Sequence, residues 1–245
     1  MIVNTIPVAL QIYSLREMFP EMPLKTMRMI REMGFSGVEF YGNHFKNNFY
    51  RALLEETGLV CAGWHTPIDA LENEKFEVTL ERSLAVGNKY ICVPWFNADT
   101  IDGWKAFADR LNAAAEKLRP YNIRTGFHCH EHEFSPVEGV LPWTIVAENT
   151  TTDVVLQLDS GNALAGGADI METLKMFPGR NHSIHWKPYS KSAGFAVPVG
   201  ADDQDWQAML KWCENEGRTE WIVLEYEKDD PLTVIKDSMD YIKKM

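Results

Sequence analysis

The sequence lacks the short motifs that hold nucleotides and the cysteine pairs that hold zinc. Neither GxGxxG nor GxxxxGK(S/T) occurs, and the first apolar run leads into QIYSLR rather than into a glycine-rich loop. The chain has 4 cysteines, and no two of them form a CxxC pair. The sequence therefore gives no case for a nucleotide cofactor, a zinc finger or a disulfide scaffold.

The sequence also has fewer basic residues than acidic ones. Lysine and arginine number 24 against 35 aspartates and glutamates, which gives a net charge of -11 at pH 7. Proteins that bind the phosphate backbone usually carry a basic face, so this balance disfavours a nucleic-acid partner. No segment approaches the roughly 18 apolar residues of a membrane span. The beginning, MIVNTIPVAL, lacks the basic region of a signal peptide. We expect a cytoplasmic protein with no membrane partner.

Short apolar runs, polar or glycine-rich turns and amphipathic segments alternate along the chain. This alternation predicts parallel strands joined by right-handed helical crossovers. Eight strand–helix units in 245 residues predict a single α/β domain over residues 1–245, folded as a (β/α)8 TIM barrel. An open doubly wound sheet is the alternative. The expected strands are Pro7–Tyr13, Gly37–Tyr41, Leu59–His65, Tyr90–Trp95, Arg124–His128, Val154–Asp159, Ser183–Lys187 and Trp221–Tyr226.

Metal-ligand and acid/base residue types gather at the ends of these strands. Strand five leads into three histidines and a glutamate, strand six ends at Asp159, and strand eight carries Glu225. Each residue alone has a commoner explanation; Asp159 before Ser-Gly, for example, is typical of a turn. In a barrel, however, all the carboxyl ends meet at one mouth. Carboxylates gathered there would repel one another unless a cation held them, so the joint pattern indicates a divalent metal.

Six segments carry a resemblance to a known family. QIYSLR, GVEFYG, HCHEHEF, LDSGN, HWKPY and WIVLEYE occur in order over essentially the whole chain. The chain resembles the xylose-isomerase-like TIM-barrel superfamily, in particular its sugar phosphate isomerase/epimerase group. The resemblance implies one divalent metal (Mn, Mg, Zn or Co) held by four side chains from strands five to eight.

The resemblance also implies which residues bind that metal. Three of the family's metal ligands correspond directly to Asp159, His185 and Glu225 of this sequence. The fourth is expected to be Glu133, which matches the glutamate of the group's histidine-rich pattern, with His128 as the substitute candidate. Glu225 would be one of the two groups that transfer the proton, and the other would be His128, His130 or Glu133. Substrate hydroxyls would be bound by Gln11, Tyr13, Glu39, His65, Trp95 and Lys187.

The activity expected from this resemblance is metal-dependent isomerisation or epimerisation of a sugar or sugar derivative, with a proton removed next to a carbonyl through an enediolate. The alternative within the superfamily is a dehydratase or lyase acting on a keto-sugar, an inosose or an oxidised glycoside. An abasic-site endonuclease is disfavoured by the acidic charge. A non-catalytic sugar-binding barrel is the remaining alternative. We expect a small carbohydrate as partner and a monomer or homodimer.

Overall fold

The structure is a computed structural model that describes residues 6–245. The expected absence of a signal peptide concerns a segment that lies largely outside this range. Eight parallel strands form one sheet in the order β6-β5-β4-β3-β2-β1-β8-β7. The strands are β1 (Val8–Gln11), β2 (Gly37–Tyr41), β3 (Val60–His65), β4 (Tyr90–Val93), β5 (Arg124–His128), β6 (Val155–Gln157), β7 (Ser183–Trp186) and β8 (Trp221–Leu224).

The first and last strands of this order, β6 and β7, come together and nearly close the sheet into a barrel. The amide of His185 donates to the carbonyl of Leu158 at 2.8 Å, and the amide of Leu156 donates to the carbonyl of Arg180 at 2.9 Å. A parallel bridge joins Asp159 to His185. The predicted (β/α)8 TIM barrel is therefore confirmed.

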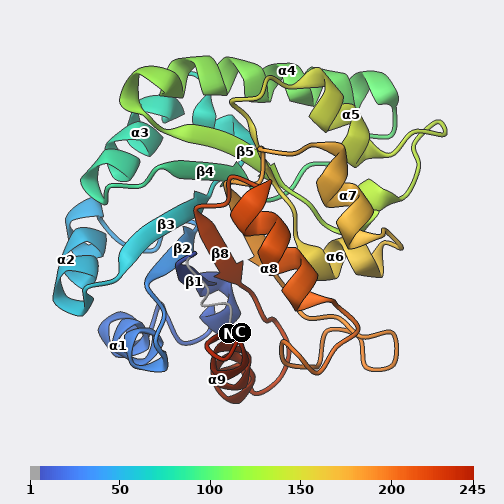
Figure 1. Ribbon diagram of the computed structural model, residues 1–245. Helices are drawn as coiled ribbons and strands as arrows, with labels where there is room; N and C mark the ends of the chain where they lie inside the picture. The colour runs from blue at the N-terminus through green and yellow to red at the C-terminus, as the bar shows by residue number, and fades with distance from the viewer. Residues whose placement is uncertain (1–5) are drawn as a thin grey trace.

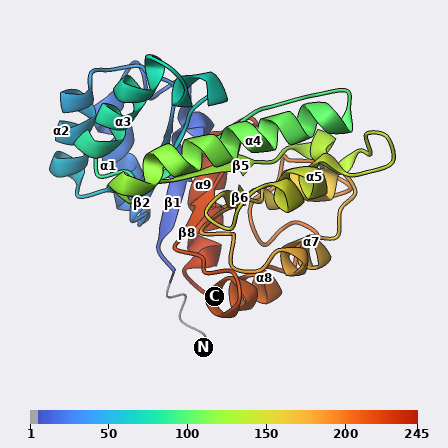
Figure 2. The same cartoon turned by 90° about the horizontal axis from the view of Figure 1, so that it is seen from above.

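Helices surround the strands on all sides (Figures 1 and 2). Their capping matches the sequence, since α1 and α2 end at Gly34 and Gly58 in the left-handed conformation that glycine adopts readily. Two short helices, α6 and α7, lie between β6 and β7. The helices are α1 (Pro23–Met33), α2 (Asn47–Thr57), α3 (Lys75–Ala85), α4 (Ile101–Leu118), α5 (Pro142–Asn149), α6 (Ser160–Ala165), α7 (Ile170–Met176), α8 (Trp206–Asn215) and α9 (Pro231–Ile242).

The hydrophobic core lies in two layers. The larger layer fills the space between the strands and the surrounding helices, and includes the buried Phe40, Trp64 and Phe127. Two smaller clusters lie inside the barrel, one of Ala9, Ala62 and Val223 and one of Tyr90, Cys92 and Val155. Small side chains in the interior leave room for the polar residues that fill the carboxyl end of the barrel.

Several strands are shorter than the sequence predicts. The strand expected at Val154–Asp159 ends at Gln157, and the one expected at Trp221–Tyr226 ends at Leu224. In both strands the regular backbone pairing with the neighbouring strand stops before the polar residues at the mouth. Asp159 instead begins α6, where its side chain accepts a hydrogen bond from the Asn162 amide at 2.8 Å.

Candidate metal centre and active-site mouth

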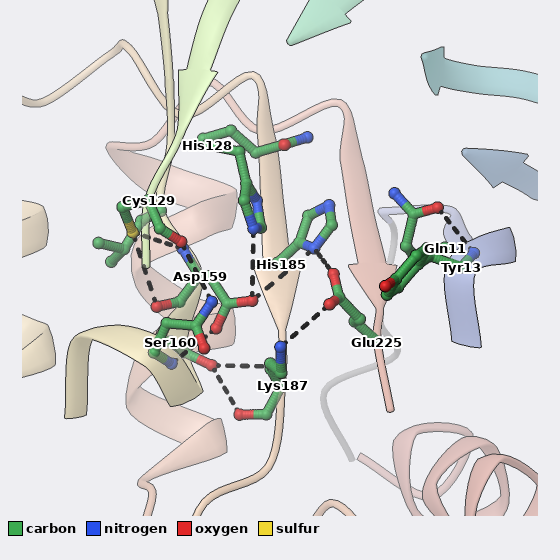
Figure 3. A network of polar contacts seen from close by, with 12 residues as sticks. Gln11, Tyr13, His128, Cys129, Asp159, Ser160, His185, Lys187 and Glu225 are labelled. Carbon is green, nitrogen blue, oxygen red and sulfur yellow. Dashed lines mark hydrogen bonds and ion pairs between the residues drawn. The ribbon is translucent and has the colours of Figure 1, made fainter. Parts of the chain in front are cut away.

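Four side chains with metal-binding atoms meet at the carboxyl end of the barrel. They come from the end of β5, the start of α6, β7 and the residue after β8 (Figure 3). One potential ligand atom from each lies within 4.8 Å of those of the other three, and all four residues are buried. We call this set the metal cluster: His128, Asp159, His185 and Glu225.

His185 lies between two carboxylates. Its Nδ1 is 2.6 Å from Glu225 Oε2, and its Nε2 is 2.6 Å from Glu39 Oε2. Burial opposes the charged form of the imidazole, but Glu39 and Glu225 outweigh this effect and raise its pKa to about 10. Without a metal, His185 is therefore a buried cation held on both sides.

The other half of the metal cluster has open hydrogen-bonding positions. Asp159 Oδ2 is buried without a hydrogen-bond partner and lies 3.9 Å from both His128 Nε2 and His185 Nδ1. Burial raises the pKa of Asp159 to about 7. Burial, followed by the nearby His185 and His65, lowers the pKa of His128, so its ring is neutral. A neutral imidazole and an unpartnered carboxylate oxygen are the donors that a divalent cation takes, so these residues fit a metal.

Glu39 is the centre of a second buried polar group, which we call the Glu39 network: Gln11, Glu39, His65 and Gln157. Glu39 is completely buried and accepts hydrogen bonds from the amides of Gln11 at 2.8 Å and Gln157 at 2.9 Å. His65 Nε2 lies 3.0 Å from its Oε2. Burial opposes ionisation of Glu39, but His65 and His185 outweigh it and lower the pKa of the carboxyl. Glu39 is thus an ionised and well-partnered carboxylate.

The local backbone makes room for this carboxylate. The pairing of β2 with β3 shifts after Val38, so that Glu39 lies opposite Gly63. A Cβ atom on Gly63 would lie 2.4 Å from Glu39 Oε1, which is too close for any other residue. The absence of a side chain at Gly63 therefore permits Glu39 to point into the barrel.

Lys187 follows β7 and lies beside the metal cluster. Its Nζ is 3.0 Å from Glu225 Oε1 and also contacts Glu227. Burial opposes its charge, but the surrounding carboxylates, Glu225 foremost, raise its pKa. Burial likewise opposes ionisation of Glu225, while Lys187 and His185 lower its pKa. Glu225 is consequently ionised, with one oxygen directed to each cation.

The structure places Glu133 outside the metal cluster. Glu133 lies in the short helix Glu131–Phe134, where Oε2 accepts from the His130 amide at 2.7 Å and Oε1 lies 3.0 Å from His132 Nε2. It is completely buried, and burial raises its pKa. His128 is the residue of the HCHEHEF segment that reaches the other three members of the metal cluster.

A cavity of about 320 Å³ opens at the mouth. Trp95 (57% exposed) and Tyr13 (39% exposed) present aromatic surface there. Trp95 packs against His130, with 4.9 Å between ring centroids, and burial lowers the pKa of His130 to about 4. Of the residues expected to bind substrate or transfer protons, those lining this cavity are Gln11, Tyr13, His65, Trp95, His128, His130 and Glu225.

Glu39 and Lys187, which sequence reasoning placed among the substrate-binding residues, are not part of this lining. Sequence reasoning also missed Gln157. This residue joins His65 to Glu39, since its Oε1 lies 2.8 Å from His65 Nε2 and its amide donates to Glu39. The sequence did contain a signal for Gln157. It is a polar residue in an otherwise apolar strand, and it lies two positions before Asp159 and therefore on the same face.

These features define a TIM-barrel protein with a candidate metal centre at the carboxyl ends of its strands. The family model described as xylose isomerase-like TIM barrel matches residues 27–245. The chain belongs to this family. A comparison with curated protein sequences gives no match. Within residues 6–245, none of the helices is both long and apolar enough to cross a membrane.

Solved structures share the whole fold at low sequence identity. A sugar phosphate isomerase/epimerase from Parabacteroides distasonis ATCC 8503 superposes with a TM-score of 0.86 at 19% identity, covering 96% of this chain and 93% of that one. The probable 3-DHS dehydratase AsbF of Bacillus anthracis gives 0.73 at 15%, covering 97% and 98%. A xylose isomerase-like barrel from Mycobacterium smegmatis, in complex with magnesium, gives 0.71 at 15%, covering 100% and 98%. These identities establish likeness of fold.

Proposed function

We propose that the protein is a metal-dependent isomerase or epimerase of a small sugar derivative, which moves a proton next to a carbonyl group. The metal cluster carries this proposal, because four buried ligand-type side chains meet at the carboxyl end of the barrel and Asp159 Oδ2 has no hydrogen-bond partner there. The Parabacteroides structure named as an isomerase/epimerase and the Mycobacterium structure with magnesium support it.

The metal would be held by His128, Asp159, His185 and Glu225, with His128 in the position where sequence reasoning expected Glu133. His185 would present Nδ1, since its Nε2 faces Glu39. This imidazole and carboxylate set suits manganese, magnesium, zinc or cobalt. A divalent ion at this site supplies a Lewis acid that polarises a substrate carbonyl.

Glu225 and His130 are the proposed proton-transfer groups. Both line the mouth cavity. Glu225 is ionised, which is the form that accepts a proton, and the ammonium of Lys187 at 3.0 Å keeps it in that form while lowering its basicity. The His130 ring is neutral at pH 7, so it acts as the second group that receives or returns the proton. Return to the original carbon from the opposite face gives an epimer, and return to the neighbouring carbon gives an isomer.

A dehydratase or lyase is the second candidate. One observation favours it: His130 lies at the mouth beside Trp95, where a histidine can protonate a departing hydroxyl group. Incubation with keto-sugars distinguishes the two activities, since nuclear magnetic resonance reads loss of water and change of stereochemistry separately.

Metal content tests the proposed function. We expect the purified protein to contain about one divalent metal per chain and the Asp159→Ala and His185→Ala variants to contain almost none, while circular dichroism shows the fold retained. Asp153→Ala is the matched control, because Asp153 is an exposed carboxylate paired with Arg119 at 3.3 Å. Unchanged metal content in either cluster variant would show that the ligand assignment is wrong.

A further inference from the structure

Arg82 is a buried arginine that no carboxylate neutralises. It lies on α3, is 9% exposed, and its guanidinium carbon is 5.2 Å from the centroid of the Trp64 ring. Within residues 6–245 it has no ion pair, and its Nε has no hydrogen-bond partner. With the Asn43 amide oriented to satisfy both of its ends, the amide oxygen accepts from the Arg82 guanidinium at 3.0 Å. Asn43 is thus the one hydrogen-bond acceptor that the described residues give the five guanidinium donors of Arg82.

Arg180 shows how this chain satisfies a buried arginine that has only a structural role. It is 6% exposed and likewise has no carboxylate partner in the described range. Its guanidinium nevertheless donates to the carbonyls of Val154 and Ala147 and to the hydroxyl of Thr150, at 2.6 to 3.1 Å. Arg82 lacks such a set of acceptors, and its side chain lines a cavity that a ligand can enter.

Arg82 lines a cavity of about 910 Å³ between α2 and α3, on the outer side of the barrel. No acidic residue lines this cavity, although the chain as a whole has a net charge of -11. Lys46 adds a second positive charge. An adjoining cavity of about 530 Å³ also contacts Arg82, and its lining further includes Glu74, Lys75 and His65.

The beginning of α2 lines the same cavity. Its N-cap residue is Lys46, and no side chain caps the helix. The amides of Phe49 and Tyr50 donate to the Lys46 carbonyl at 3.0 and 3.3 Å, which leaves the amides of Asn47 and Asn48 as the open donors of the first turn. A helix beginning with free amides attracts anions through its dipole. The start of α2 therefore attracts an anion to this cavity in addition to Arg82, which lies on a different helix.

We propose that this cavity binds the phosphate group of a small organic molecule, at a site separate from the metal cluster. The Arg82 side chain on α3 and the first residues of α2 line the same cavity, and a tetrahedral phosphate has enough oxygen atoms to accept hydrogen bonds from both elements. Phe45 and Phe49 provide an apolar wall for the rest of the molecule, with 4.8 Å between their ring centroids. The site uses none of the residues assigned to the proposed reaction.

Titration of the full chain with inorganic phosphate, followed by amide nuclear magnetic resonance, tests the proposal. We expect saturable shifts at the Asn47 and Asn48 amides, which are distinct from any phosphate effect at the mouth. Arg82→Gln weakens this binding by about tenfold or more, because it removes a charge-assisted donor pair. Arg51→Gln leaves it unchanged, since Arg51 is an exposed arginine on α2 that pairs with Glu55 at 3.8 Å.

Asn47→Pro tests the helix contribution without changing the fold. Asn47 is the first residue of α2, where proline is tolerated, and Lys46 already has the extended conformation that precedes proline. Loss of one amide donor weakens phosphate binding several-fold, whereas Asn47→Ala retains it. The proposal is overturned if the wild type shows no saturable shift, if Arg82→Gln binds phosphate as tightly as wild type, or if acetate binds more tightly than phosphate.

Discussion

The two buried polar groups at the carboxyl end of the barrel differ in how completely their atoms are paired. In the Glu39 network the central carboxylate is contacted by two amides and two imidazoles. In the metal cluster, Asp159 Oδ2 is buried with no hydrogen-bond partner, and the ring nitrogens of His128 and His185 lie 3.9 Å away. The two groups meet at His185, which has one ring nitrogen on each side.

This difference separates a framework from a binding site. A buried charge with all its partners stabilises one arrangement of the chain, whereas a buried oxygen without partners costs stability unless a ligand contacts it. The Glu39 network therefore holds His185 in place, and the open atoms of the metal cluster are the ones that the proposed cation would contact. Outer partners of this kind fix the orientation of a metal-binding histidine in many metalloproteins.

Removing Glu39, the central residue of the Glu39 network, is expected to have the largest effect on stability. Glu39→Ala leaves the buried His65 without its carboxylate and His185 with Glu225 alone, and it lowers the free energy of unfolding by about 3–5 kcal/mol. Glu39→Gln keeps the shape of the side chain and costs less. Urea denaturation of the metal-free protein measures both changes. An exposed pair provides the control: Glu56→Ala, which breaks a 2.6 Å contact with Arg28, costs only about 0–1 kcal/mol. An equal, small cost for Glu39→Ala would contradict the framework role.

The pH dependence of stability gives a smaller and more specific effect. The His185 pKa rises from 6.5 to about 10 on folding, so its contribution to stability is fully present below pH 6.5 and is lost as pH rises toward 10. Denaturation of the metal-free protein at several pH values should show this decline. Glu39→Gln should flatten it, because the variant lacks one of the two carboxylates that raise the pKa. An identical slope in the variant would rule out Glu39 as a cause.

The sequence predicted the fold well because its signals are local and repeated. Eight apolar runs separated by amphipathic segments define the barrel, and each run overlaps an observed strand. The exact strand ends were not predictable. Whether the ladder continues to Asp159 depends on its pairing with the neighbouring strand, and here the Asp159 side chain begins a helix instead.

The site was predictable in part for the same reason. Barrel geometry predicted that polar strand ends such as Asp159 and Glu225 meet at one mouth, and the family resemblance implied that these two residues and His185 bind the metal. The choice between His128 and Glu133 depended on where β5 ends, since the alternation of faces no longer applies once the chain leaves the strand. The burial of Arg82 was not predictable from the sequence, because an arginine within an amphipathic helix is usually exposed.

Replacing Asp159 with asparagine tests the division between framework and metal cluster most directly. Asparagine keeps the oxygen that caps α6 but removes the unpaired charge. We predict opposite effects in one variant: the metal-free protein becomes more stable by about 1–2 kcal/mol, while metal affinity falls by about a hundredfold or more. Calorimetry measures both on the same sample. A variant that loses stability and still binds metal as tightly as wild type would contradict the account.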